Sequence, residues 1–282
     1  MRRHLLKIAG SFLATTIACA GAAQDFPRRV VSMNLCTDQL AMLTAGPGQL
    51  LSVSYLATEP VSSAMSDAAR DYAINHGLAE EIFLMEPDLV LAGAYTTRAT
   101  VELLRKLGIQ VEEFAPEASI ADIRSNIARM GDLLGQQARA AALVAELEDK
   151  LAAAKPVEPS GLTVATYYAN SFTSGDGTLV DAVIRTVGLT NMATTLGYSG
   201  TARLPLELLV LATSDILANG ESDYEGPALA EQNFVHPAFA ALAGRVEKAN
   251  IPARYTICGA PFTAEAVRLL GDAATRAKAA RR

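Results

Sequence analysis

Tryptophan is absent from this 282-residue sequence, and histidine and cysteine occur three times each. Neither Cys-x-x-Cys nor His-x-x-x-His spacing is present, so the sequence predicts no zinc site. It also lacks the Gly-x-Gly-x-x-Gly and Gly-x-x-x-x-Gly-Lys loops that hold nucleotide phosphates, and the Gly-x-Ser-x-Gly turn of serine hydrolases. We therefore expect a protein that is not an enzyme, with no catalytic residues, no resident metal and no intrinsic cofactor.

Long apolar runs are scarce, and the longest of them begins the chain. Arg2, Arg3 and Lys7 precede an apolar stretch over residues 8–17, after which small residues are frequent. This order is typical of a secretory signal peptide, and the apolar part is shorter than the roughly 20 residues that cross a bilayer. We expect residues 1–22 to be removed on export to the periplasm.

A second reading of the same segment makes Cys19 a lipid-anchored first residue. Thr16 stands where such a signal normally has a large aliphatic side chain. We therefore favour the cleaved signal peptide over the lipid anchor.

Basic residues are outnumbered in the rest of the chain. Without Arg2, Arg3 and Lys7 the sequence keeps 21 basic residues against 30 acidic ones. An acidic chain without basic clusters is a poor partner for nucleic acid or anionic lipid. The remaining length of roughly 260 residues is enough for two domains of ordinary size.

Residues 23–118 alternate short apolar runs with helical patterns. Strands are expected at residues 30–33, 50–54, 88–92 and 109–114, and helices at 37–44, 78–85 and 97–107. Short strands separated by helices favour a parallel sheet. We therefore expect an N-terminal α/β lobe.

Residues 119–156 consist almost entirely of helix-forming residues. Ser119 with Asp122 makes a capping start, apolar residues then recur with a period of 3.6, and Gly135 is expected to break or kink the run. Pro156 ends it. We expect a long, rigid helical connector, since a flexible linker would be rich in Gly and Ser.

Residues 157–282 return to alternation and predict a second α/β lobe. Strands are expected at residues 162–167, 215–219 and 254–258, and helices at 179–187, 206–212 and 261–278. The two lobes also contain similar segments at an offset of 127 residues. The segment EEIFLMEPDLVLAG matches ELLVLATSDILANG at four positions, which pair Glu80 with Glu207, Leu84 with Leu211, Asp88 with Asp215 and Gly93 with Gly220.

Parallel α/β sheets bind ligands at the carboxyl ends of their strands. The residues expected there are aromatic or neutral polar: Asn34, Cys36, Tyr55, Tyr95, Tyr167, Tyr168 and Phe172. Such a set suits a large, partly apolar ligand held by stacking and a few hydrogen bonds. The alternative for each tyrosine is packing within a lobe.

Three further features leave alternatives open. His76 either faces the ligand or is a turn residue bonded to the backbone. Cys36 and Cys258 are either bridged across the two halves or, as we favour, free thiols. Glu80 and Glu207 each open a helix, where the dipole stabilises a carboxylate, or each presents an acid to a basic partner surface.

The sequence resembles the class III periplasmic binding proteins, which serve ABC importers of iron-siderophores, haem and cobalamin. The matching stretches are RRVVSMNLCTDQLAML, NHGLAEEIFLMEPDLVLAG, the helical run 119–155 and LPLELLVLATSDILANG. The resemblance implies two Rossmann-like lobes joined by one rigid helix, with the ligand between them. It also implies that Glu80 and Glu207 dock on arginines of the permease, although Ser214 and Asp215 stand where a proline is common.

The ligand does not follow from the resemblance. We expect a monomer that binds a small-molecule metal chelate, with a ferric siderophore or haem favoured and cobalamin second, because the cobalamin branch often has tryptophan in its cleft. Iron ligands for haem are offered by Tyr55, Tyr95, Tyr167, Tyr168 and His76, and partners for an anionic catecholate by Arg98 and Arg203. The alternative of another class is an envelope chelatase or hydrolase using Asp38, Asp176 and His76.

Overall fold

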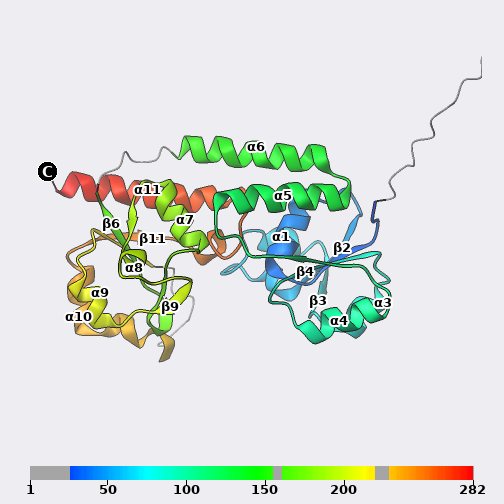
Figure 1. Cartoon of the computed structure of the whole chain (residues 1–282), viewed down its shortest axis with the longest axis horizontal. Coiled ribbons are helices and arrows are strands. Elements are labelled where there is room, and N and C mark those ends of the chain that lie inside the picture. Colours follow the sequence, from blue (N-terminus) through cyan, green and yellow to red (C-terminus); the bar gives the residue numbers. More distant parts are fainter. Residues whose placement is uncertain (1–25, 155–160, 220–228, 282) are drawn as a thin grey trace, which may run out of the picture.

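The computed structural model describes residues 26–154, 161–219 and 229–281 (Figure 1). The expected signal peptide and the lipid-anchor alternative at Cys19 lie outside the described residues. Within the described ranges, none of the helices combines the length and the apolar character that a membrane span requires.

The N-terminal lobe is built on a five-stranded sheet with the order β3-β2-β1-β4-β5, in which all neighbours are parallel. Its strands are β1 (Val30–Ser32), β2 (Leu50–Ser54), β3 (Ala73–Asn75), β4 (Leu89–Gly93) and β5 (Val111–Phe114). Its helical segments are α1 (Leu35–Thr44), η1 (Tyr55–Thr58), α2 (Ser66–Ala69), α3 (Ala79–Leu84) and α4 (Arg98–Lys106).

Helices cover both faces of this sheet, because alternate residues of its central strands enter two different cores. Val30 and Leu91 pack in the cluster that includes α1, whereas Val31 and Val90 pack with Ile82 of α3 and with α4. Strands buried on both faces are nearly continuous apolar runs, as expected for a parallel sheet. The arrangement leaves the carboxyl ends of the strands as the accessible edge.

The C-terminal lobe has a four-stranded parallel sheet with the order β11-β10-β6-β8 and a separate antiparallel pair, β7-β9. The strands are β6 (Thr163–Thr166), β7 (Phe172–Ser174), β8 (Thr190–Asn191), β9 (Thr201–Arg203), β10 (Ile216–Asn219) and β11 (Glu247–Asn250). The helical segments are η2 (Ala169–Ser171), α7 (Leu179–Thr186), α8 (Met192–Thr195), α9 (Leu206–Leu211), η3 (Leu229–Val235), α10 (Pro237–Ala243), η4 (Ala253–Tyr255) and α11 (Thr263–Ala280).

The connector consists of two helices, α5 (Ile120–Leu134) and α6 (Gln137–Ala153), that lie side by side (Figure 1). Ser119 caps α5 by accepting a hydrogen bond from the Asp122 backbone N–H, and Gly135 ends it at φ +69°. A left-handed residue at that position favours glycine, which explains the break expected there. Both helices reach both lobes: Leu147 of α6 is buried in the N-terminal core and α6 also packs against α11, while α5 packs on α1 and contacts α7.

Two expectations about strands are corrected. Residues 254–258 are not a strand; η4 and a short loop occupy them, and the last strand is β11. The edge strands β3 and β11 were missed because their residues are mostly exposed and carry no apolar run. The antiparallel pair β7-β9 was also not expected.

One buried carboxyl group in the N-terminal lobe is unusual. Asp38 of α1 is fully buried and accepts a 2.5 Å hydrogen bond from Ser54 Oγ at its Oδ2, while Oδ1 has no hydrogen-bond partner in the described structure. Burial raises the pKa of Asp38 to about 6, and hydrogen bonds from Ser32 and Ser54 oppose the rise only in part. Below about pH 6 the folded protein therefore favours the protonated form of this carboxyl group.

This pKa predicts a pH dependence of stability. Between pH 3.8 and about 6 the folded state holds a proton that the unfolded state has lost, so the favourable contribution of the protonated form disappears as the pH rises. The loss amounts to roughly 3 kcal/mol. Urea unfolding at several pH values should show the free energy of unfolding falling across this window in the wild type relative to Asp38→Asn. Parallel curves for the two proteins would contradict the assignment.

Candidate functional site

A cleft of about 740 Å³ lies between the two lobes, and we call it the interlobe chamber. Its lining comes from Tyr95, Pro116, Glu117 and Ala118 on one side and, on the other, from Tyr168, Ser174, Gly177, Thr178, Leu179, Val180, Gly200, Thr201, Ile251, Ala253, Thr256 and Ile257. The size falls within the range of about 300–1,000 Å³ of small-molecule sites. Both lobes therefore contribute to one concave surface.

A second cavity of about 270 Å³, the N-lobe chamber, adjoins it and is mainly apolar. It is lined by Asn34, Cys36, Thr37, Leu40, Gly93, Ala94, Tyr95, Phe114, Ala115, Pro116, Glu117 and Ile257. Tyr95, Pro116, Glu117 and Ile257 line both chambers. These four residues therefore form the boundary between the two parts of the cleft.

Three neighbouring strands position the N-terminal side of the cleft. The chain leaves β1 at Asn34, β4 at Tyr95 and β5 at Pro116, and these strands are adjacent in the sheet. Asn34 caps α1 by accepting a hydrogen bond from the Cys36 backbone N–H at 3.0 Å. Tyr95 is 88% exposed, so its ring is available for contact with a ligand.

Tyr168 supplies the facing aromatic residue from the C-terminal lobe. It is half-buried, and its hydroxyl group bonds with Ser174 and Thr166. Burial raises the pKa of Tyr168, and these hydrogen bonds oppose the rise. The hydroxyl group of Tyr168 is thus already engaged within the lobe, and its ring forms part of the wall of the cleft.

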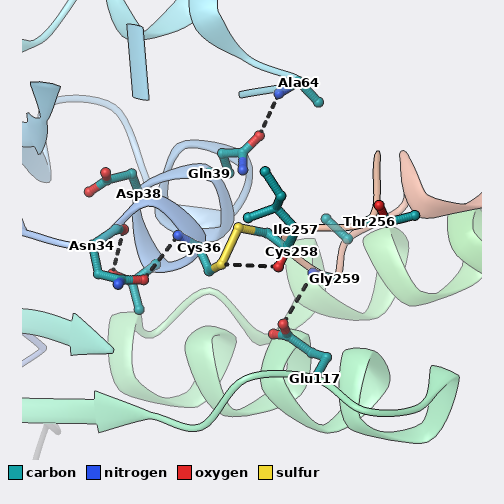
Figure 2. The surroundings of a disulfide bond; sticks show 12 residues. Asn34, Cys36, Asp38, Gln39, Ala64, Glu117, Thr256, Ile257, Cys258 and Gly259 are labelled. Atoms are coloured by element: carbon teal, nitrogen blue, oxygen red, sulfur yellow. Dashed lines mark hydrogen bonds between the residues drawn. A yellow bond between two sulfur atoms is a disulfide. The ribbon is translucent and has the colours of Figure 1, made fainter. Parts of the chain in front are cut away.

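Cys36 and Cys258 form a disulfide bond, with their Cα atoms 5.0 Å apart (Figure 2). The expectation of two free thiols was therefore wrong. The bond joins the first turn of α1 in the N-terminal lobe to the loop that precedes α11, over a separation of 222 residues. Because Cys36 lines the N-lobe chamber and Ile257 lines both chambers, the bridge lies at the wall of the cleft.

A hydrogen-bonded contact next to the disulfide fastens the same loop (Figure 2). Glu117 Oε2 accepts a 3.1 Å hydrogen bond from the Gly259 backbone N–H, and Oε1 accepts a 2.7 Å bond from Asn126 Nδ2 of α5. A Cβ atom on Gly259 would lie 2.6 Å from Ile123 and 2.7 Å from Glu117, so the close approach requires glycine. We call the disulfide and this contact together the interlobe latch.

Tyr167 and Phe172 do not line either chamber. Tyr167 is fully buried in the C-terminal lobe, stacked on Phe239 at 5.7 Å, and its hydroxyl group donates to Ser171 Oγ at 2.9 Å. The expectation that it meets the ligand is thus corrected: its side chain points into the core, and that of the next residue, Tyr168, reaches the cleft. Phe172 lies in β7 beneath the Arg203 guanidinium group.

Tyr55 and His76 lie together at the carboxyl ends of β2 and β3, outside the lining of both chambers. Their rings stack at 5.7 Å, and His76 Nδ1 lies 3.1 Å from Glu81 Oε1. The hydrogen bond that the His76 backbone N–H donates lowers the pKa of Glu81, and the His76 side chain adds to this effect. The His76 side chain thus bonds with a carboxylate of its own lobe, neither with the backbone nor within the lining of the two chambers.

The groups considered for an enzyme are also separate. Asp38 is buried beneath α1, Asp176 pairs with Arg185, and His76 bonds with Glu81. Within the described ranges, no group of three or more His, Cys, Asp or Glu side chains is arranged to hold a metal ion. Arg98 and Arg203 are not among the residues that line the two chambers.

Sequence reasoning missed several lining residues, above all Glu117 and Ile257. Glu117 follows β5 by three residues, so the rule for strand ends could have found it. Ile257 carried no such signal, because residues 254–258 were expected to be a strand rather than a loop at the cleft. The hydroxyl residues Ser174, Thr178 and Thr201 also gave no signal that set them apart from other surface positions.

Glu80 and Glu207 occupy equivalent places in the two lobes. Each lies in the first turn of a six-residue helix, α3 or α9, and each side chain is exposed. Figure 1 shows α3 and α9 near opposite ends of the molecule, both on the side away from the α5–α6 connector. The geometry leaves both carboxylates available to a partner.

A comparison of the sequence with models of known protein families gives a match. Residues 30–222 match the model of the periplasmic binding protein family, which is more than half of the chain. The protein therefore belongs to the periplasmic binding protein family.

The individual relatives bind different solutes. A cobalamin-binding protein of Halobacterium salinarum is 28% identical over 201 residues, which cover 70% of this chain and 54% of the relative. The chain thus spans about half the length of the curated relatives it matches. The periplasmic heme-binding protein RhuT from Roseiflexus sp. RS-1 has a TM-score of 0.71 at 21% identity, covering 89% of this chain and 98% of that one.

The periplasmic vitamin B12 binding protein BtuF of Vibrio cholerae has a TM-score of 0.67 at 18% identity, covering 89% of this chain and 98% of that one. At these identities the two structures establish the shared fold.

The latch predicts a measurable loss of stability. Replacing both cysteines by serine, Cys36→Ser with Cys258→Ser, should lower the free energy of unfolding by about 2–5 kcal/mol, because a long covalent loop no longer restricts the unfolded chain. Chemical denaturation with and without a reductant checks this. Reductant should destabilise the wild type by a similar amount and leave the double variant unchanged; two reactive thiols in unreduced wild-type protein would contradict the bridge.

Proposed function

We propose that this protein is the periplasmic solute-binding component of an ABC importer. As a non-enzymatic monomer, it captures a small-molecule metal chelate between its lobes and delivers it to the membrane permease. The observation that carries the proposal is the interlobe chamber, which draws neutral polar and aromatic side chains from both lobes around one space. Such a site can enclose a bulky solute between the two lobes.

The lining favours an uncharged or amide-rich ligand such as cobalamin. Asn34 and Thr201 offer neutral hydrogen-bonding groups, and Tyr95 and Tyr168 offer aromatic faces from opposite sides. Ser174 and Thr178 add hydroxyl groups that already bond within the C-terminal lobe. The carboxylate at the boundary, Glu117, already accepts two hydrogen bonds. The cobalamin-binding relatives support the same choice. We therefore place cobalamin ahead of the iron chelates that the sequence alone favoured.

Haem is a second candidate, and one residue favours it. Of the iron ligands considered from sequence, only Tyr95 and Tyr168 line the chambers, and the hydroxyl group of Tyr168 already bonds with Ser174 and Thr166. Tyr95 is highly exposed and free to approach an iron centre. A tyrosine can serve as the axial ligand of haem iron.

Variants of Tyr95 separate these two ligands. Tyr95→Ala should raise the Kd for either ligand about tenfold or more, because an aromatic contact is lost. Tyr95→Phe keeps the ring, so it should leave cobalamin binding nearly unchanged. It should abolish coordination of the haem iron, because the phenol oxygen is absent. Titrations with cyanocobalamin, haem, and ferric hydroxamate and catecholate siderophores, followed by visible absorbance, provide the test.

Tyr55→Ala is the matched control for these titrations, since Tyr55 is an exposed tyrosine of the same lobe outside both chambers. It should bind the ligand as the wild type does. Failure of the wild type to bind any member of the panel, or equal loss of affinity in the Tyr55 variant, would count against the proposed site.

We further propose that Glu80 and Glu207 dock on basic residues of the permease, one from each lobe. Exposed charges steer encounter more than they add affinity. Replacing both by lysine should slow association with the permease about tenfold to a hundredfold at low salt and impair uptake, with the ligand Kd unchanged. A parallel loss of ligand affinity in the double variant would instead place these residues at the ligand.

A further inference from the structure

The helices α3 and α9 expose leucine as well as glutamate. Leu84 is 80% exposed at the end of α3, and Leu211 is 76% exposed at the end of α9. Each leucine follows the glutamate of its helix by four residues, which places both side chains on the same helical face, one turn apart. Each lobe therefore presents a carboxylate beside an apolar side chain.

The two glutamate–leucine pairs are related by the internal repeat. Glu80 corresponds to Glu207 and Leu84 to Leu211 at the same offset of 127 residues. Phe83 at 48% exposure enlarges the apolar surface of α3, and Leu208 at 39% enlarges that of α9. Single exposed leucines are common on protein surfaces. A glutamate–leucine pair repeated at equivalent positions of the two lobes is less common than a single exposed leucine. It suits a partner that presents the same binding surface twice.

We propose that Leu84 and Leu211 hold the docked complex together, each inserting into an apolar socket that lies beside a basic residue on one of two similar permease subunits. The inference rests on the proposed function, and it assigns different roles to the glutamate and the leucine of each pair. An exposed ion pair contributes little net affinity, whereas a buried leucine contributes more. The glutamates therefore govern the association rate and the leucines govern the dissociation rate.

The two roles can be separated with binding kinetics on the permease reconstituted in lipid nanodiscs. Leu84→Ala with Leu211→Ala should raise the dissociation rate by about tenfold per leucine, and leave the association rate and its salt dependence unchanged. The control replaces the same number of exposed leucines, one in each lobe, outside α3 and α9: Leu107→Ala with Leu229→Ala. The control variant should dissociate from the permease at the wild-type rate.

The outcomes distinguish the inference from the function on which it rests. Absence of any binding between wild-type protein and permease would overturn the proposed function. Normal binding by the wild type with an unchanged dissociation rate in the Leu84 and Leu211 variant would overturn the inference alone. Sedimentation of the wild type as a dimer that this variant cannot form would also overturn it, because a second copy of the chain would then be the occupant.

Discussion

The interlobe latch is the constraint on which the rest of the site depends. The Cys36–Cys258 bond and the Glu117–Gly259 hydrogen bond fix one loop of the C-terminal lobe against the N-terminal lobe. That loop carries Ile257, which forms part of the boundary between the two chambers. The position of the boundary is thus set by a covalent bond rather than by packing alone.

The latch and the connector restrict the lobes in different ways. Helix α6 packs on elements of both lobes and sets their separation along one side, whereas the latch joins them at the cleft. Because the latch adds a covalent bond to the packing of the connector on both lobes, the lobes can change their relative orientation less freely than with the connector alone. A preorganised cleft binds its ligand with a smaller entropic cost, since less conformational freedom is lost on binding.

Much of the fold could be predicted because buried parallel strands are distinctive in sequence. The apolar run of β2 matches its predicted bounds, and β4 differs by one residue at each end. Strands β3 and β11 escaped prediction because few of their side chains are buried and neither contains an apolar run, whereas the edge strand β5 buries Val111 and Phe114 and was predicted.

The site was less predictable than the fold, for reasons that particular residues make clear. The rule for strand ends identified Asn34 and Tyr95, but it could not decide between Tyr167 and Tyr168. These neighbours point in opposite directions, so a shift of one residue exchanges core and cleft. The sequence named the Cys36–Cys258 bridge only as an alternative to free thiols, because no local pattern reports the proximity of two cysteines 222 residues apart.

The central claim is that the cleft between the lobes holds a metal chelate. Native mass spectrometry of the protein purified from the periplasm of its host tests this most directly. We expect a single adduct per chain that contains a metal, absorbs visible light and is less abundant when Tyr95 is replaced by alanine. An adduct without metal, or one retained in full by that variant, would contradict the account.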